Sequence, residues 1–113
     1  MFQKITRTSD YKLINREGSR LRTDSLFLRY LRRNDQVVSV GCTASRKVGC
    51  AVDRNKAKRR MRELTRLCFG EFVSGVSYVF IATDRVPSTD FQTLRSEFVR
   101  LLQKVKASVE SAK

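Results

Sequence analysis

Arginine and lysine are concentrated in one predicted helix, which begins soon after Gly49 and ends near residues 69–70. At about 100° per residue, its apolar side chains fall on one side; they are Ala57, Met61, Leu64 and Cys68. The side chains that fall roughly opposite are Asn55, Lys58, Arg59, Arg62 and Arg66. The guanidinium group is a planar fork of donors that matches phosphate oxygens. The pattern predicts a helix that is anchored by its apolar side and presents cations to a polyanion.

A solvated charged face is the ordinary explanation of a run of charge. It fits poorly here, because only Asp53 and Glu63 oppose the cations between residues 53 and 66. Like charges four residues apart, such as Lys58 and Arg62, destabilise a helix by roughly 0.2–0.5 kcal/mol per pair. We therefore predict that these cations contact nucleic-acid phosphates.

The composition is that of a folded and strongly basic protein. The chain has 113 residues, 41% of them hydrophobic, with a formal net charge of +13. This length allows a core without disulfides or metal, and the charge is typical of a nucleic-acid binder. We expect a single nucleic-acid-binding domain over residues 1–113, with a loose tail of about five or six residues at its end.

Groups suited to metal binding or to catalysis by the protein itself are scarce. The chain has no His, and Cys42, Cys50 and Cys68 lack CxxC spacing, which argues against a zinc site. We expect these cysteines to be reduced and mostly buried. No Ser or Cys has an evident general base and no carboxylates cluster, so we expect no protein-based catalysis and no metal on protein side chains.

The chain also lacks signals for a membrane. No run approaches the roughly 18–20 apolar residues that span a bilayer. The first seven residues lack the apolar core of a signal peptide. We therefore expect a cytoplasmic protein.

The elements that must position the basic helix follow from periodicity and turn residues. A short helix is expected after Ser9 or Asp10, with Gly18 as its stop. A short strand over residues 20–23 and a longer one over residues 25–31 come next.

Two further strands, over residues 37–44 and 76–82, enclose the basic helix in sequence. Thr89 and Gln92 resemble a capping box at the start of a final helix. Its core-facing side chains are Phe91, Leu94, Phe98, Leu101, Leu102 and Val105. The order α-β-β-β-α-β-α predicts a single-domain α+β fold with one central sheet packed by helices. The strands around the basic helix would form a βαβ unit, and nearly all such crossovers are right-handed.

The strand over residues 37–44 has one face of small residues, namely Ser39, Gly41 and Thr43, followed by Ser45. Small side chains leave room above a sheet. We expect this face to receive a ligand or a packed neighbour.

Residues 46–62 join a glycine turn to the start of the basic helix. They read Arg46-Lys47-Val48-Gly49-Cys50-Ala51-Val52-Asp53-Arg54-Asn55-Lys56-Ala57-Lys58-Arg59-Arg60-Met61-Arg62. This stretch resembles, with the same spacing and without a gap, the signature of the bacterial ribonuclease P protein subunit. That family carries Lys-Lys-x-Gly-Asn-Ala-Val before an Arg-Asn-Arg helix that continues as x-Lys-Arg-x-x-Arg. A weaker resemblance extends from the helix with Tyr11 to about residue 106.

The resemblance implies a protein subunit of an endoribonuclease whose catalytic subunit is RNA. That RNA removes the 5′ leader from precursor tRNA by hydrolysis that depends on Mg²⁺, which the RNA mainly binds. The implied partners are the catalytic RNA and precursor tRNA, with no membrane and no obligate protein partner. The family's crossover around the basic helix is left-handed, and we expect the same here.

The resemblance also assigns two surfaces. The basic helix faces the catalytic RNA, through Arg54, Asn55, Lys56, Lys58, Arg59, Arg62 and Arg66. A cleft between the first helix and the sheet holds the single-stranded leader, lined by Tyr11, Phe27, Arg29, Thr43, Arg46 and Lys47. Aromatic rings there would stack bases and cations would follow the backbone. Core packing is the alternative for Tyr11 and Phe27, and solvated charge is the alternative for Arg29 and Lys47.

Four positions depart from the family pattern. Lys56 stands where a second Arg is usual and Cys50 where Asn is usual, while Asn15 and Arg29 occupy positions that are commonly aromatic. The last two departures concern the leader surface.

Parts of the sequence are also compatible with other functions. A ribosomal-type structural RNA-binding protein would have similar charge and size. A helix-turn-helix DNA binder would need a second helix just before the basic one, where the sequence predicts a strand. A protein-only nuclease is the least supported, since the chain has no His.

Overall fold

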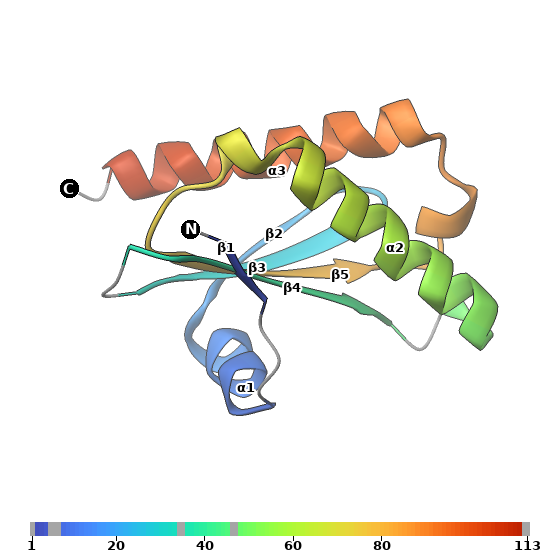
Figure 1. The fold of residues 1–113 in the computed structure, drawn as a ribbon, viewed down its shortest axis with the longest axis horizontal. Helices are drawn as coiled ribbons and strands as arrows, with labels where there is room; N and C mark the ends of the chain where they lie inside the picture. Colours follow the sequence, from blue (N-terminus) through green and yellow to red (C-terminus); the bar gives the residue numbers. More distant parts are fainter. Residues whose placement is uncertain (1, 5–7, 34–35, 46–47, 112–113) are drawn as a thin grey trace.

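A central sheet carries helices on both of its faces (Figure 1). The computed structural model describes residues 2–4, 8–33, 36–45 and 48–111, with side chains from residue 11 to residue 110 within those ranges. The sheet has the order β1-β4-β5-β3-β2. Its strands are β1 (Phe2–Lys4), β2 (Ser19–Arg22), β3 (Leu26–Arg32), β4 (Val38–Ala44) and β5 (Val76–Ala82).

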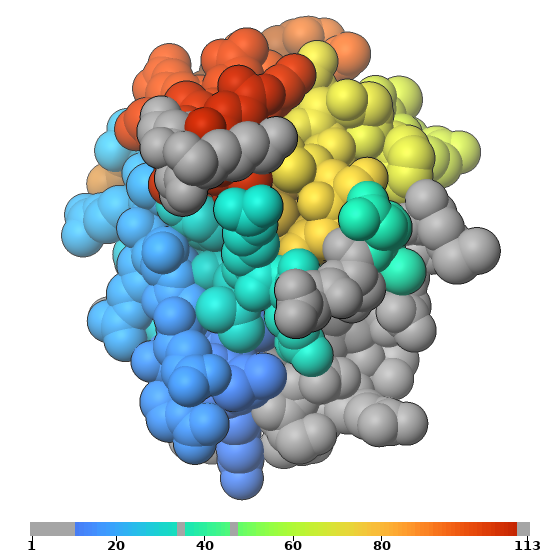
Figure 2. All heavy atoms as spheres, turned by 90° about the vertical axis from the view of Figure 1, so that its left-hand side faces the viewer, coloured from blue at the N-terminus to red at the C-terminus, as the bar shows by residue number. Residues whose placement is uncertain are grey.

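The helices are α1 (Thr8–Glu17), α2 (Ala51–Leu67) and α3 (Phe91–Ser111), with short 3₁₀ turns η2 (Phe69–Glu71) and η3 (Val86–Ser88). Figure 1 shows α1 below the sheet and α2 and α3 above it. Figure 2, which looks at the left end of that view, shows the same layers, with orange-red α3 at the top and blue α1 at the bottom. The predicted α+β class and element order are confirmed.

The crossover around α2 joins parallel neighbouring strands, since β4 pairs with β5 in register from Ser39↔Ser77 to Ala44↔Ala82. In Figure 1 both strands run from left to right with β4 in front, and α2 returns from right to left above them. This path is left-handed. The general preference for right-handed crossovers therefore fails here, as the family resemblance led us to expect.

The main core lies between the sheet and the pair α2 and α3. Strand β5 is its centre, with every residue buried except Ile81. The rings of Tyr78 and Phe80 stack on one another, and Phe80 stacks on Phe98 of α3 with 4.4 Å between centroids. A smaller cluster on the other face is centred on Ile14 and Val79 and holds α1 against the sheet.

Several local predictions need correction. Strand β1 was not predicted, because three residues carry no readable period; it pairs with β4 from Phe2↔Val38. Helix α1 begins at Thr8, earlier than expected, and α3 extends to Ser111, well into the segment predicted as a loose tail.

The cap of α3 is also different from the predicted one. The Asp90 carboxylate accepts a hydrogen bond from the Thr93 N–H at 3.1 Å, so Asp90 caps the helix. The Thr89 hydroxyl instead donates to the Arg85 carbonyl. The prediction that a Thr89–Gln92 box starts the helix is wrong, because the preceding 3₁₀ turn engages Thr89.

The cysteines differ in burial. Cys68 is buried and Cys42 half-buried, but Cys50 is exposed at the start of α2. The prediction of mostly buried cysteines is thus wrong for Cys50, which lies beyond the part of α2 that covers the core. Burial raises the pKa of the Cys68 thiol, an effect that the nearby Arg95 partly offsets.

We predict that Gly18→Ala lowers the free energy of unfolding by about 1–3 kcal/mol, because an added Cβ would clash with the backbone carbonyls of Ile14 and Tyr30. The loss should outweigh the roughly 0.4–1 kcal/mol gained from a stiffer unfolded chain. Urea unfolding monitored by circular dichroism measures the change. Gly70→Ala is the matched control, since a Cβ there meets nothing within 4 Å. Equal stability of the two variants would contradict the prediction.

Candidate nucleic-acid interface

Helix α2 is anchored as its apolar pattern predicts. Ala57, Met61 and Leu64 are fully buried, and Cys68 is buried directly after the helix. Thr65 is also buried, which the sequence did not indicate; its hydroxyl donates to the Met61 carbonyl at 2.8 Å and so has a partner. The anchored side fixes the direction in which every cation of the helix points.

The predicted RNA-contacting residues of α2 lie on its outer side. Arg54, Asn55, Arg59, Arg62 and Arg66 are exposed, and Lys56 and Lys58 are half-buried. Within the described residues, Lys58, Arg59 and Arg62 form no ion pair. These three cations are therefore available to an external anion.

Arg66 differs from the other predicted contacts because it is paired. Its guanidinium donates to both carboxylate oxygens of Glu63, at 2.8 and 2.9 Å. The pair is exposed, with 74% of the Arg66 side chain accessible, and exposed pairs are weak. A phosphate could replace the carboxylate at low cost.

Arg60 has a structural role. Its guanidinium donates to the carbonyls of Val86 and Thr89, in and just after η3. These bonds tie the middle of α2 to the segment that leads into α3. The sequence offers no signal for this role, because the carbonyls are 26 and 29 residues away.

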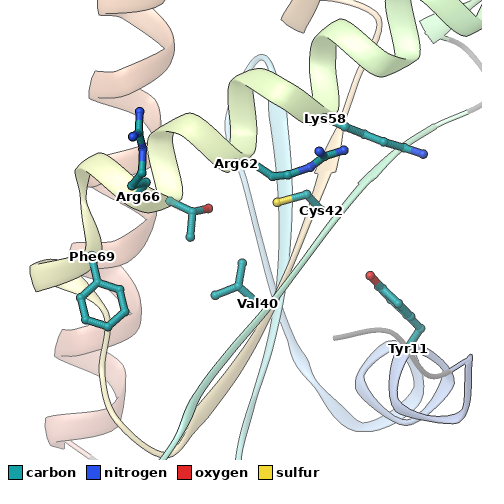
Figure 3. Close-up of a pocket in the computed structure, with 8 residues that line it drawn as sticks. Tyr11, Val40, Cys42, Lys58, Arg62, Arg66 and Phe69 are labelled. Carbon is teal, nitrogen blue, oxygen red and sulfur yellow. The ribbon is translucent and has the colours of Figure 1, made fainter. Parts of the chain in front are cut away.

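A cavity of about 650 Å³ lies between α1, the edge of β4 and α2. Figure 3 shows the Tyr11 hydroxyl directed toward it from α1, with Lys58 and Arg62 reaching over it from α2. Its floor includes Val40 and Cys42, and its lining is completed by Thr65, Arg66 and Phe69. Phe69 is 41% exposed. Sequence reasoning missed Val40, Cys42 and Phe69 as lining residues, because their spacing is that of ordinary core positions.

The leader residues predicted on the sheet share the face that carries α1. Thr43 pairs with Ile81 and Ile81 with Phe27, so these three side chains form a row across β4, β5 and β3. Arg29 stands in the adjacent row, opposite Val79. The structure thus brings Tyr11, Phe27, Arg29 and Thr43 to one side of the sheet, whereas Arg46 and Lys47 lie outside the described residues.

Tyr11 occupies the space above the small residues of β4. A Cβ on Gly41 would lie 2.5 Å from the Tyr11 hydroxyl oxygen, so the absence of a side chain at Gly41 lets the ring approach. The face of small residues therefore receives a packed neighbour. Burial raises the pKa of the Tyr11 hydroxyl above its usual value, and the nearby Cys42 adds to the shift. The hydroxyl is protonated at neutral pH and can donate a hydrogen bond.

Two of the departures from the family pattern contact one another. The Arg29 guanidinium donates to the Asn15 side-chain carbonyl at 3.0 Å. A hydrogen-bonded pair thus stands where the family commonly has two aromatic residues. The pair places a cation in the row of the sheet next to that of Phe27.

Known proteins resemble this chain over nearly its whole length. The model of the ribonuclease P family matches residues 2–106. This chain belongs to the ribonuclease P protein family. The ribonuclease P protein component of Carboxydothermus hydrogenoformans is 30% identical over 111 residues, covering 96% of this chain and 95% of the relative. That of Geotalea uraniireducens is 31% identical over 104 residues, covering 92% and 91%.

Solved structures of the same family share the fold. The RNase P protein from Thermotoga maritima superposes with a TM-score of 0.81 at 27% identity, covering 90% of this chain and 96% of that one. The Staphylococcus aureus RNase P protein superposes with a TM-score of 0.79 at 21% identity, covering 91% and 94%. Membership of the ribonuclease P protein family implies a subunit of an endoribonuclease.

The family and the fold argue against two of the alternative functions, a ribosomal-type protein and a helix-turn-helix DNA binder. Family membership argues against a ribosomal-type protein. Among the described residues, helix α2 follows strand β4 with no α-helix between them, which differs from the helix pair of a helix-turn-helix protein. In the part of the chain that the structure describes, no helix is long and apolar enough to span a membrane.

Arg60 and its neighbour Arg59 allow a matched test of structural and surface roles in this ribonuclease P protein. We predict that Arg60→Ala destabilises the fold by about 1–2 kcal/mol, because two partly buried carbonyl groups lose a charged donor. Arg59→Ala should change stability by less than about 0.5 kcal/mol, since the side chain is exposed. Thermal and urea unfolding of both variants measure the difference. Indistinguishable stabilities would remove the structural role from Arg60.

Proposed function

We propose that this protein binds the catalytic RNA of ribonuclease P through α2 and the 5′ leader of precursor tRNA through the α1 face of the sheet. The observation that supports the proposal best is the arrangement of two different surfaces beside one cavity. One surface is a rigid array of cations, and the other combines aromatic rings with cations. Tyr11 and Arg62 line the same cavity, so both RNAs would meet there.

The α2 surface suits folded RNA. Phosphate contacts and shape dominate the recognition of helical RNA. Lys58, Arg59 and Arg62 project from a helix whose other side is fully buried, so their positions are fixed by the core. Like charges on neighbouring turns destabilise an isolated helix, and bound phosphates would remove that cost.

The α1 face suits a single strand. Stacking on aromatic rings tolerates any base, and cations follow the backbone of an unpaired strand. Phe27 is 39% exposed, although burial is the rule for Phe. Because mature tRNA has no leader, contacts on this face would favour the precursor over the product.

The chemical step belongs to the RNA in this proposal. Among the described residues, no three Cys, Asp or Glu side chains gather where they could hold a metal ion. We assign the Mg²⁺ that the hydrolysis requires to the RNA subunit, as the family resemblance implies. The contribution of the protein would be positional and electrostatic, and the test is cleavage of precursor tRNA at low Mg²⁺ with and without the protein.

We predict that replacing Arg59 and Arg62 together by Ala weakens binding to the catalytic RNA and lowers the salt slope of log K by about one per lost phosphate contact. Both side chains are exposed, so the fold should be retained. Filter binding at several salt concentrations measures both quantities. The control is the Arg100→Ala and Lys104→Ala pair, which removes the same charge from the exposed side of α3. Unchanged affinity and slope for the α2 pair would contradict the assignment.

We predict that Tyr11→Ala in the holoenzyme selectively weakens the binding of precursor tRNA, because a stacked base contributes roughly 1–3 kcal/mol to that binding. Mature tRNA should bind nearly as before, and Tyr11→Phe, which keeps the ring, should retain most of the preference. Equilibrium binding of both tRNAs to each holoenzyme gives the comparison. If both tRNAs lose affinity equally, Tyr11 acts only in packing.

A further inference from the structure

The face that carries α1 continues past the predicted leader residues onto the edge strand β2. Arg22 pairs with Phe27 and Arg20 pairs with Arg29 across the β2–β3 hairpin. The two rows of this face therefore end on arginines, one running Thr43–Ile81–Phe27–Arg22 and the other Gly41–Val79–Arg29–Arg20. Arg20 and Arg22 were not among the residues that the sequence assigned to a site.

The positions of these arginines destabilise the β2–β3 hairpin. Arg20 and Arg29 are directly opposite each other, and like charges in that position destabilise an antiparallel pair. Within the described residues, Arg20, Arg22 and Arg29 form no ion pair. Leu21 packs on the main core from the opposite face, so the hairpin cannot turn its arginines away.

The exposed ring of Phe27 lies beneath one of these cations. The Arg22 guanidinium carbon is 5.8 Å from the centroid of that ring, which is within the range of a cation–π contact. Both side chains are exposed. A base could stack on this ring or on the guanidinium plane while its phosphate meets Arg20, which is the combination that single-strand binders use. A merely solvated charged face would not need an exposed Phe at its centre.

We propose that Arg20, Arg22 and Phe27 form a distal contact site for the leader, which crosses the strands of the sheet from β4 to β2. This inference rests on the proposed function of the α1 face. Three inter-strand spacings separate β4 from β2, a distance of about 14 Å. At an advance of at least about 3.4 Å per nucleotide along the path, this distance corresponds to at most about four nucleotides.

The position of the cavity determines the direction in which the leader crosses the sheet. Tyr11 lines the cavity together with Lys58 and Arg62 of α2, where the catalytic RNA is proposed to bind. The leader nucleotides nearest the cleavage site therefore lie near Tyr11. Nucleotides farther from that site reach β2, so a short leader contacts Tyr11 and does not contact Arg20 or Arg22.

The test compares leader lengths in the reconstituted holoenzyme. Precursor tRNAs with leaders of about two and about eight nucleotides are bound to the Arg20→Gln and Arg22→Gln double variant, which keeps the aliphatic stems of both side chains. The affinity for the long-leader substrate should fall about tenfold, and its salt slope should fall by about one to two. The short-leader substrate should change less than about twofold.

The control removes two charges elsewhere. The Arg100→Gln and Lys104→Gln variant changes exposed residues of α3, on the other side of the sheet (Figure 1), and should affect both leaders equally and weakly. Equal losses for the two leader lengths, or no loss for either, in the β2 variant would overturn the distal site. Tyr11→Ala measured in parallel separates the two hypotheses: if it still weakens both precursors relative to mature tRNA, the proposed function stands while the distal site fails.

Discussion

Burial of strand β5 is the constraint on which the rest of the structure depends. This strand lies between β4, which is parallel to it, and β3, which is antiparallel. The ring of Phe80 stacks on Phe98 of α3, and truncating a ring in such a core typically costs about 3–5 kcal/mol. That amount is a large part of the roughly 5–15 kcal/mol that stabilises a domain of this size. Strands β3 and β4, which pair with β5 directly, carry the α1 face, and α2 packs in the same core as the rings of β5.

The basic helix illustrates how a core can support a charged surface. Its like charges cost a few tenths of a kcal/mol per pair, whereas each fully buried Leu or Met side chain contributes about 1.5–3 kcal/mol. Met61 and Leu64 are both fully buried, so the apolar side outweighs the repulsion on the outer side. Arg60 adds bonds to η3 that hold the helix in its crossing position. The outer cations can therefore remain without internal partners at little risk to the fold.

The two surfaces are linked at the edge of β4. Gly41 lets the ring of Tyr11 approach the strand, and the Tyr11 hydroxyl borders the cavity that Lys58 and Arg62 reach from the other side of the sheet (Figure 3). A leader bound to the α1 face and an RNA bound to α2 would thus meet at strand β4. The pairing of Asn15 with Arg29 gives the α1 face of this chain more charge and fewer rings than the family pattern.

Much of this arrangement is readable from the sequence, because it depends on local periodicity. The apolar stripe of α2, its opposing cations and the α+β element order follow from spacing alone, and the motif at residues 46–62 indicates the family. The sequence did not predict β1, the Asp90 cap or the exposure of Cys50, since these depend on short segments or on where the core ends.

Only the tertiary structure decided which chemical groups meet. Arg60 looks like its neighbours in sequence, yet its carbonyl partners come from a segment 26 to 29 residues away. The local sequence around Arg20 and Arg22 does not indicate a site. Strand register places these two residues opposite Arg29 and Phe27. Local sequence sets the face on which a side chain stands, but pairing between distant strands sets its neighbours, and no periodicity within one segment encodes that pairing.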